Sequence, residues 1–245
     1  MIYITGDCHG EYSKFSSKRF PDGKEMTRND YVVVCGDFGY WDKSKESEYW
    51  LDWLSKKKFT ILWVDGNHEN FDMLKELPVK EWNGGKVQFI RDNVIHLMRG
   101  QVFELEGKKF FTFGGARSHD IQDGILDPDD PDFYRKYKIL SRSYAYFRVN
   151  HYSWWKEEMP NELEMAEGLM NLEKVDFDVD YIITHCCSSS IQTLLGGYEP
   201  DELTTYFEKI KNITRYDRWY FGHYHQNKYV DMHNICLFNT IQRIV

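Results

Sequence analysis

Several short apolar runs of this sequence each end in a cluster of Asp, Asn or His side chains. Carboxylate oxygen, amide oxygen and imidazole nitrogen together form a donor set that suits Mn²⁺, Fe or Zn²⁺. In an extended chain alternate residues point the same way, so both members of a D-x-H or H-x-H motif can face one ion. The candidate ligands are Asp7 and His9, Asp37, Asn67, His185, and His223 with His225.

Each of these motifs also has an ordinary structural explanation. Asp and His are common in loops, and Gly-Asp after a strand is frequently turn chemistry. The run GNHE, Gly66–Glu69, could begin a helix with Asn67 as its cap. The run GHYH, Gly222–His225, is more specific, because two imidazoles two residues apart on an extended segment seldom serve packing. Five of the 9 histidines fall in these clusters, which favours a metal site over coincidence.

The elements that must position these residues follow from the hydrophobic pattern. Short β-rich runs, most of them ending at Gly, predict strands at MIYIT, YVVVC, FTILWV, FFTF, YIIT and RWYF. The intervening KESEYWLDWLSKK has helical spacing and places on one face Tyr49, Trp50, Trp53 and Leu54. Further helices are predicted to begin at the N-cap residues Asn70, Asn161 and Asp201. This alternation predicts an α/β layered fold with the site at the strand ends.

Residues 118–155 differ in character from the rest of the chain. DIQDGILDPDDPD is acidic and rich in turn residues, and the following YRKYKILSRSYAYFRVNHYSWW is basic and aromatic. We expect an excursion from the sheet here, either a lid or substrate wall or a solvated surface insertion. The aromatic residues of 133–155 could stack on a nucleobase, although aromatic residues more often belong to a core.

The overall composition limits the classes of function. The chain has 245 residues, 42% of them hydrophobic, which is enough for one large domain or two small ones. A net charge of −8 disfavours non-specific binding to nucleic acid. No apolar run approaches the roughly 18 residues of a membrane span, and MIYITGDCHG does not resemble a signal peptide. An odd number of cysteines, 5, without a CxxC pair favours the reducing cytoplasm.

Taken in order, the motifs GDCHG, GD, GNHE, a His after a strand, and GHYH resemble those of the calcineurin-like metallophosphoesterases, over residues 6–225. The resemblance implies two packed β-sheets flanked by helices, and we expect one domain over 1–245 with an inserted segment at 118–155. It also implies two metal ions, the first bound by Asp7, His9 and His225 and the second by Asn67, His185 and His223, with Asp37 bridging them. Manganese is the first expectation for the metal, and Fe, Zn²⁺ or Ni²⁺ are alternatives.

The function implied is hydrolysis of a phosphomonoester or phosphodiester of a small molecule or nucleotide, by attack of a hydroxide that bridges the two ions. By the same resemblance Asp37 and His68 are catalytic: His68 stabilises developing charge or protonates the leaving oxygen. Asn67 and His68 are also expected to contact the substrate. Glu69 is either a partner of this site or an ordinary carboxylate at a helix start.

The sequence departs from one branch of that family. GDCHG and GNHE look like the motifs of phosphoprotein phosphatases, in which an Asp-Arg pair follows the second motif. Here Tyr40 and Trp41 stand at those positions. A serine/threonine phosphoprotein phosphatase is therefore the alternative function, and a non-catalytic scaffold of the same fold is the second alternative. Nuclease action fits poorly with the negative charge.

Arg117 is a candidate substrate contact, because it follows a strand and a flexible Gly pair and its planar guanidinium suits phosphate oxygens. The alternative for Arg117 is a surface residue or a salt bridge. His119 is either a partner of the metal ligands or a loop residue. No comparable signal marks the remaining histidines, His96, His151 and His233. The sequence does not indicate the oligomeric state.

Overall fold

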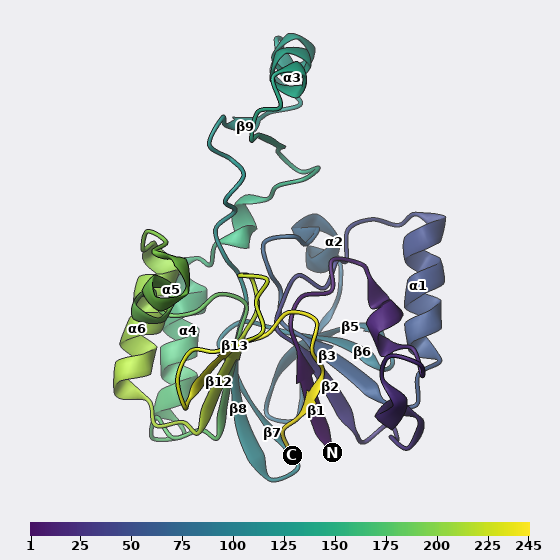
Figure 1. Cartoon of the computed structure of the whole chain (residues 1–245), viewed down its shortest axis with the longest axis vertical. Helices are drawn as coiled ribbons and strands as arrows, with labels where there is room; N and C mark the ends of the chain where they lie inside the picture. The colour runs from purple at the N-terminus through teal and green to yellow at the C-terminus, as the bar shows by residue number, and fades with distance from the viewer.

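A seven-stranded mixed sheet carries the first half of the chain in the computed structural model, which describes all residues 1–245 (Figure 1). Its four central strands β1, β2, β3 and β6 run parallel, and the outer strands are antiparallel to their neighbours. In spatial order the strands are β15 (Gln242–Arg243), β1 (Ile2–Thr5), β2 (Tyr31–Val34), β3 (Thr60–Trp63), β6 (Val94–Leu97), β5 (Gly85–Arg91) and β4 (Val79–Trp82).

A six-stranded sheet packs against the first. The four strands β14, β12, β11 and β8 run parallel, and an antiparallel strand closes each edge. In spatial order they are β13 (Lys228–Tyr229), β14 (Asn234–Cys236), β12 (Arg218–Phe221), β11 (Tyr181–Thr184), β8 (Lys108–Phe113) and β7 (Gln101–Leu105). The parallel strands of both sheets follow the crossover pattern of α/β folds.

Helices cover the outer faces of the two sheets (Figure 1). The first sheet is covered by α1 (Lys45–Ser55) and α2 (Phe71–Lys75), with the 3₁₀ turns η1 (Tyr12–Phe15) and η2 (Pro21–Lys24). The second sheet is covered by α4 (Glu162–Glu173), α5 (Ser189–Gly196) and α6 (Glu202–Ile213). No helix is both long enough and apolar enough to cross a lipid bilayer.

The alternation of side chains along each strand divides the core into three layers. In β1, Ile2 and Ile4 point into the layer between the sheets, and Tyr3 points to the layer beneath the helices. The layer between the sheets combines residues from both of them, such as Leu62 and Ile183. The predicted sandwich of two sheets flanked by helices is therefore confirmed.

Most of the predicted elements are present, with one correction. The six predicted strands are β1, β2, β3, β8, β11 and β12, and Asn70, Asn161 and Asp201 cap α2, α4 and α6 through their side chains. The predicted buried face of α1 is wrong in part: Tyr49 is exposed, and Leu51 is buried with Leu54. The neighbouring strands β4 to β7 were not predicted.

Within the predicted segment 118–155, residues 119–154 extend away from the two sheets and form the excursion (Figure 1). The excursion contains β9 (Ile125–Leu126), α3 (Phe133–Arg142) and β10 (Arg148–Val149), and β9 pairs with β10 in parallel. No residue of α3 is buried. The chain returns to the body at the 3₁₀ turn η3 (Lys156–Glu158).

Candidate metal centre

Five loops bring the predicted ligands together at one edge of the sandwich. They follow β1, β2, β3, β11 and β12, which are parallel strands within their sheets, so their carboxyl ends meet. The loop after β1 carries Asp7 and His9, and the loop after β2 carries Asp37. The remaining three loops carry Asn67 with His68, His185, and His223 with His225.

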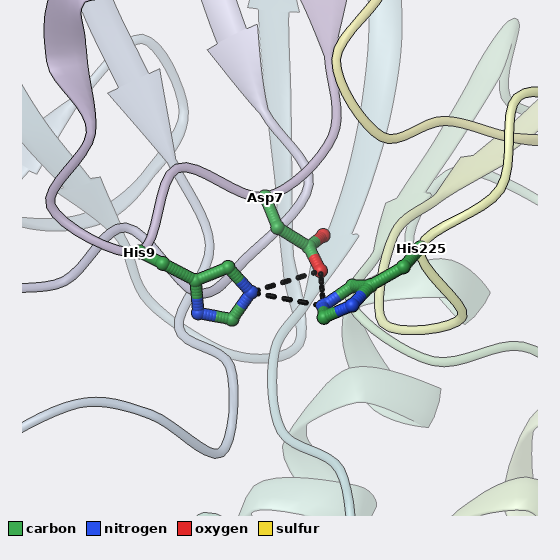
Figure 2. Close-up of side chains that lie close together, drawn as sticks. All are labelled: Asp7, His9 and His225. Atoms are coloured by element: carbon green, nitrogen blue, oxygen red, sulfur yellow. Dashed lines mark hydrogen bonds and ion pairs between the residues drawn. The ribbon is translucent and has the colours of Figure 1, made fainter.

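The first cluster consists of Asp7, His9 and His225, whose ligand atoms point toward one another (Figure 2). The Nε2 atoms of His9 and His225 are 2.9 Å apart. Oδ2 of Asp7 lies 3.6 Å from Nε2 of His9 and 3.2 Å from Nε2 of His225. Two imidazole lone pairs and a carboxylate oxygen thus surround one small space, as ligands of a single cation would.

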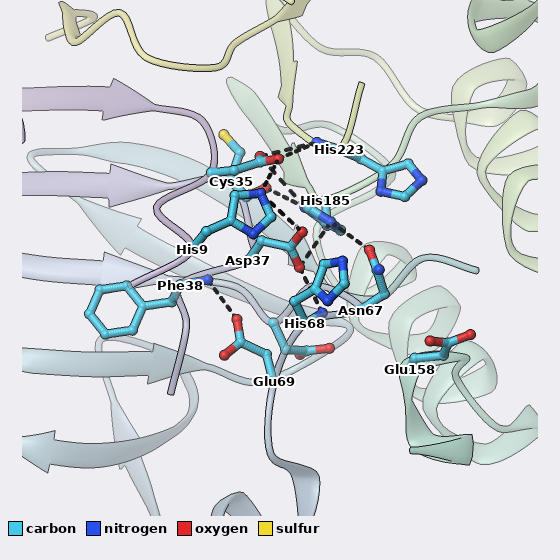
Figure 3. A network of polar contacts seen from close by, with 12 residues as sticks. His9, Cys35, Asp37, Phe38, Asn67, His68, Glu69, Glu158, His185 and His223 are labelled. Atoms are coloured by element: carbon cyan, nitrogen blue, oxygen red, sulfur yellow. Dashed lines mark hydrogen bonds and ion pairs between the residues drawn. The ribbon is translucent and has the colours of Figure 1, made fainter. Parts of the chain in front are cut away.

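Asp37 lies between this first cluster and a second cluster, which consists of His185 and Asn67 (Figure 3). Its Oδ2 is 3.7 Å from Nε2 of His9, and its Oδ1 is 3.3 Å from Nε2 of His185. The same His185 nitrogen is 3.2 Å from Oδ1 of Asn67. Nδ1 of His185 bonds the carbonyl of Cys35 at 2.8 Å, which directs Nε2 at Asp37 and Asn67.

His223 takes a different orientation from the other predicted ligands. Its backbone N–H donates to both carboxylate oxygens of Asp7, at 3.1 and 3.2 Å. Its ring nitrogen Nε2 lies 2.8 Å from Nε2 of His119, so the two imidazoles share a hydrogen bond. Of the two interpretations of His119, the structure favours a partner of a predicted ligand over an isolated loop residue.

The charges of this centre call for a cation. The side chains of Asp7 and Asp37 are buried, and their ion-pair partners are histidines, with no Lys or Arg among them. Burial opposes the ionisation of Asp7, but hydrogen bonds with His225 and His9 outweigh it and lower the pKa to about 2. Burial likewise opposes a charge on His185, yet Asp37 raises its pKa to about 10. Buried charges need compensation, and the donor set fits divalent metal ions.

Backbone strain marks the same loops. His9, Asp37, His223 and His225 all have positive φ, between 42° and 66°, which is rare for residues with a Cβ. Such strain concentrates at functional sites, where the surrounding structure enforces it. The glycines that precede the ligands serve close packing: a Cβ on Gly66 would lie 2.0 Å from Oδ1 of Asp37, and one on Gly222 would lie 2.0 Å from Oδ1 of Asp7.

His68 lies beside the metal centre, and Glu69 stabilises the neighbouring loop. The backbone N–H of His68 donates to Oδ1 of Asp37 at 2.8 Å, and its ring packs edge-on against His9. Burial lowers the pKa of His68, against the opposing charge of Asp37. The buried carboxylate of Glu69 accepts the N–H groups of Phe38, Gly39 and Tyr40 at 2.6, 3.2 and 2.9 Å. Glu69 therefore fixes the loop that presents Asp37.

A buried polar network beneath the site has no counterpart in the sequence predictions. Asp65 accepts bonds from Nε and Nη2 of Arg99 at 2.9 and 2.6 Å and lies 3.1 Å from Nε2 of His96. Ser118 donates its N–H to Glu158 at 3.0 Å, and Nδ2 of Asn67 lies 3.3 Å from the Ser118 hydroxyl. These contacts join residues 31 to 51 positions apart, so no local motif signals them.

Arg117 and His68 line different cavities. Its Nη2 forms an exposed salt bridge with Glu202 at 3.1 Å. It also lines a cavity together with His119 and His223. The structure thus places Arg117 near His119 and His223, with its guanidinium paired to the surface carboxylate of Glu202.

Comparison with known proteins identifies the family. Residues 1–227 match the calcineurin-like phosphoesterase family. The chain belongs to that family. The family is metal-dependent, which agrees with the candidate ligand groups at the strand ends.

Individual relatives of this chain are more distant. Lariat debranching enzyme A of Xenopus laevis is 28% identical over 143 residues, which are 51% of this chain and 26% of that protein. Lariat debranching enzyme of Danio rerio is 24% identical over 153 residues, 55% of this chain and 26% of that protein. The chain thus spans about a quarter of the length of these relatives. A phosphopantetheinyl hydrolase structure from Mycobacterium tuberculosis superposes with a TM-score of 0.45 and 13% identity, over 97% of this chain and 89% of that one.

Proposed function

We propose that this protein is a dinuclear phosphoesterase that hydrolyses a phosphomonoester or phosphodiester of a small molecule or nucleotide. The observation that carries the proposal is the position of Asp37. Its two buried carboxylate oxygens face different imidazole clusters, Oδ2 toward His9 and Oδ1 toward His185. A carboxylate in that position suits two cations better than one.

In this proposal the chain supplies the ligands predicted above. Asp7, His9 and His225 hold the first ion, Asn67, His185 and His223 hold the second, and Asp37 bridges them. Manganese is the proposed metal, and the same oxygen and nitrogen donors accept Fe, Zn²⁺ or Ni²⁺. When bound, such ions polarise phosphoryl oxygens and lower the pKa of a bound water. The proposed unit is one domain over 1–245, in which residues 118–155 form a substrate wall.

His68 is proposed to act on the substrate rather than on the metal. Its backbone N–H is committed to Asp37, which leaves the imidazole free to turn toward the phosphoryl group. A ring N–H can donate to oxygen that gains charge as the ester bond breaks, and can pass a proton to the leaving oxygen. Asn67 and Arg117 remain predicted substrate contacts, and Arg117 is expected to contribute little because its guanidinium is paired with Glu202. The cytoplasmic location remains a prediction from the cysteine content.

The test is the variant His68→Asn, assayed with the metal-loaded protein. We expect metal content by elemental analysis to stay near two ions per chain, while kcat on p-nitrophenyl phosphate and bis(p-nitrophenyl) phosphate falls about 10²–10⁴-fold. His233→Asn is the matched control, because His233 bonds the carbonyl of Asp217 far from the site. A His68→Asn protein that loses metal together with activity would show that His68 is a ligand.

A substrate panel separates the alternatives. A phosphopeptide hydrolysed faster than all small esters would establish the phosphoprotein phosphatase instead. Wild-type protein with less than one ion per chain and no hydrolysis would establish the scaffold. Because the relatives are named lariat debranching enzymes, a lariat belongs in the same panel of substrates. The aligned region is too short to assign their substrate to this chain.

A further inference from the structure

A cavity of about 440 Å³ opens beside His9 and His68, where the excursion meets the body. Its volume is within the range of pockets that bind small organic ligands. Beyond the two histidines of the site, its lining consists of Trp41, Arg148, Tyr152, Ser153 and Trp155. Three large aromatic rings and a cation therefore adjoin the place where an ester would be cleaved.

Trp41 is held in place although it is largely exposed. Its ring nitrogen Nε1 donates to the carbonyl oxygen of His68 at 2.7 Å, and 42% of its surface remains accessible to solvent. Gly10, with φ of +74°, lets the ring approach closely, since a Cβ there would lie 3.2 Å from Cζ3 of Trp41. A fixed and exposed indole beside His68 is suited to stacking.

Tyr152 lines the same cavity, on a turn that hydrogen bonds hold at both ends. Oδ2 of Asp72 bonds Nδ1 of His151 and Nε1 of Trp155, each at 2.7 Å. Between these anchors, the carbonyl of Val149 accepts the N–H groups of Tyr152 and Ser153 at 3.1 and 2.9 Å. The turn is thus rigid, yet Tyr152 is 79% exposed at its tip. A large exposed ring on an ordered turn is typical of a recognition surface.

The polar groups of the cavity match an organic phosphate. Arg148 bonds Asp120 through Nε and Nη2, which orients the guanidinium and leaves Nη1 without a partner in the chain. The Ser153 hydroxyl oxygen accepts the N–H of Val149 at 3.0 Å, so its proton is available to a ligand. A guanidinium suits phosphate oxygens, and a hydroxyl suits the polar edge of a flat ring.

We propose that this cavity is a nucleobase subsite, in which a base stacks on Trp41 and Tyr152 while Arg148 binds the phosphate that lies beside His68 and the candidate metal ligands. The proposal rests on the phosphoesterase function proposed above and names its substrate class as nucleoside phosphate esters. Aromatic stacking tolerates every base, because each base has a π-face. The subsite selects a nucleoside over a small alkyl group and does not select among bases.

Two phosphodiesters with the same leaving group test the subsite. Thymidine 5′-(p-nitrophenyl phosphate) and methyl p-nitrophenyl phosphate both release p-nitrophenolate, and only the first carries a base. With manganese-loaded protein we expect kcat/KM to favour the nucleoside ester by about 10–100-fold, mainly through KM. Trp41→Leu and Tyr152→Leu should each reduce this ratio about tenfold. Tyr144→Leu is the control, because Tyr144 is an exposed ring of the excursion outside the cavity.

The outcomes separate the subsite from the function. If both esters are hydrolysed with a ratio near one, or if Trp41→Leu and Tyr152→Leu both keep the wild-type ratio, the subsite is wrong and the phosphoesterase stands. If neither ester is hydrolysed, the proposed function fails, and calorimetric titration with thymidine 5′-monophosphate decides the subsite. Binding that weakens in both variants supports it, and equal or absent binding overturns it. Tyr152→Leu is not expected to disturb folding, because its side chain is exposed.

Discussion

The metal centre and the excursion both border the cavity beside His68, and they are built in opposite ways. The centre gathers side chains from the loops after β1, β2, β3, β11 and β12 (Figure 3), and Asp7, Asp37, Asn67 and His185 among them are buried. The excursion is a single continuous segment whose one helix has no buried residue (Figure 1). The first depends on the whole sandwich, and the second on its own attachment points.

Because of that difference, we expect the metal centre to determine the reaction and the excursion to determine the substrate preference. Ligands fixed by strand ends and strained backbone can hold metal ions in one geometry, which metal-assisted hydrolysis at this centre would require whatever the phosphoester. A segment attached at its base can change length and sequence without altering the sheets. The attachment itself is ordered, since Ser118 and Glu158 bond where the chain leaves and returns. Loss of a centre residue should therefore abolish the reaction, and loss of an excursion residue should change its substrate preference.

Asp37→Asn is the strongest test of the centre. The variant removes the charge that faces both clusters, so we expect loss of both ions and a fall in kcat of at least about 10³-fold. Elemental analysis and p-nitrophenyl ester hydrolysis measure the two effects. Asp92→Asn, at an exposed turn, is the control and should keep both. Retention of two ions by the Asp37 variant would exclude a bridging role.

Arg99→Met tests the ordered attachment that connects the two regions. Arg99 pairs with buried Asp65 and donates to the carbonyl of Glu157 at 2.7 Å, at the return of the excursion. Its loss leaves the buried carboxylate of Asp65 with His96 as its remaining partner, so the free energy of unfolding should fall by about 3–5 kcal/mol in urea denaturation. Arg91→Met removes a more exposed ion pair with Glu48 and should cost at most about 1 kcal/mol. Equal losses in the two variants would contradict the role given to Arg99.

The contrast between the regions also explains what the sequence could predict. The strands, the helix caps and the convergence of the ligands follow from local patterns and from the rule that parallel strand ends share an edge. The Asp65–Arg99 pair and the Ser118–Glu158 bonds join residues 34 and 40 positions apart, and each residue type is ordinary in its own context. The orientation of His223 toward His119 depends on the excursion loop, which has no periodic pattern.

The missed strands have a related cause. Polar and apolar residues alternate from Lys86 to Phe89 in GKVQFIR, and Asn83-Gly84 just before it is a hairpin signal between β4 and β5. This hairpin signal lies between the GNHE and FFTF runs, whose sequence patterns are more pronounced. On α1, Leu51 rather than Tyr49 packs into the core, and helical spacing alone does not predict which of the two is buried.

Asp72→Asn tests the wall of the excursion. Asp72 clamps the turn that carries Tyr152, and neutral Asn weakens its bonds to His151 and Trp155. We expect KM for thymidine 5′-(p-nitrophenyl phosphate) to rise about two- to fivefold, with metal content unchanged, because this partly exposed carboxylate contributes modestly. Glu76→Gln, just past the end of the same helix and paired with Lys43, is the control. Loss of metal from Asp72→Asn would show that the wall and the centre are not separable.

Arg117→Gln should have the smallest effect and compares two arginines near the site. Arg117 is exposed and paired with Glu202, whereas Arg148 is oriented by Asp120 beside His68. An exposed ion pair contributes little, so kcat/KM on the nucleoside ester should change by less than about twofold in Arg117→Gln. Arg148→Gln, assayed beside it, should lower the same constant about tenfold through the lost guanidinium. The reverse order would place the phosphate at Arg117, as the Gly pair before it predicts, and would move substrate recognition to the cavity beside His119.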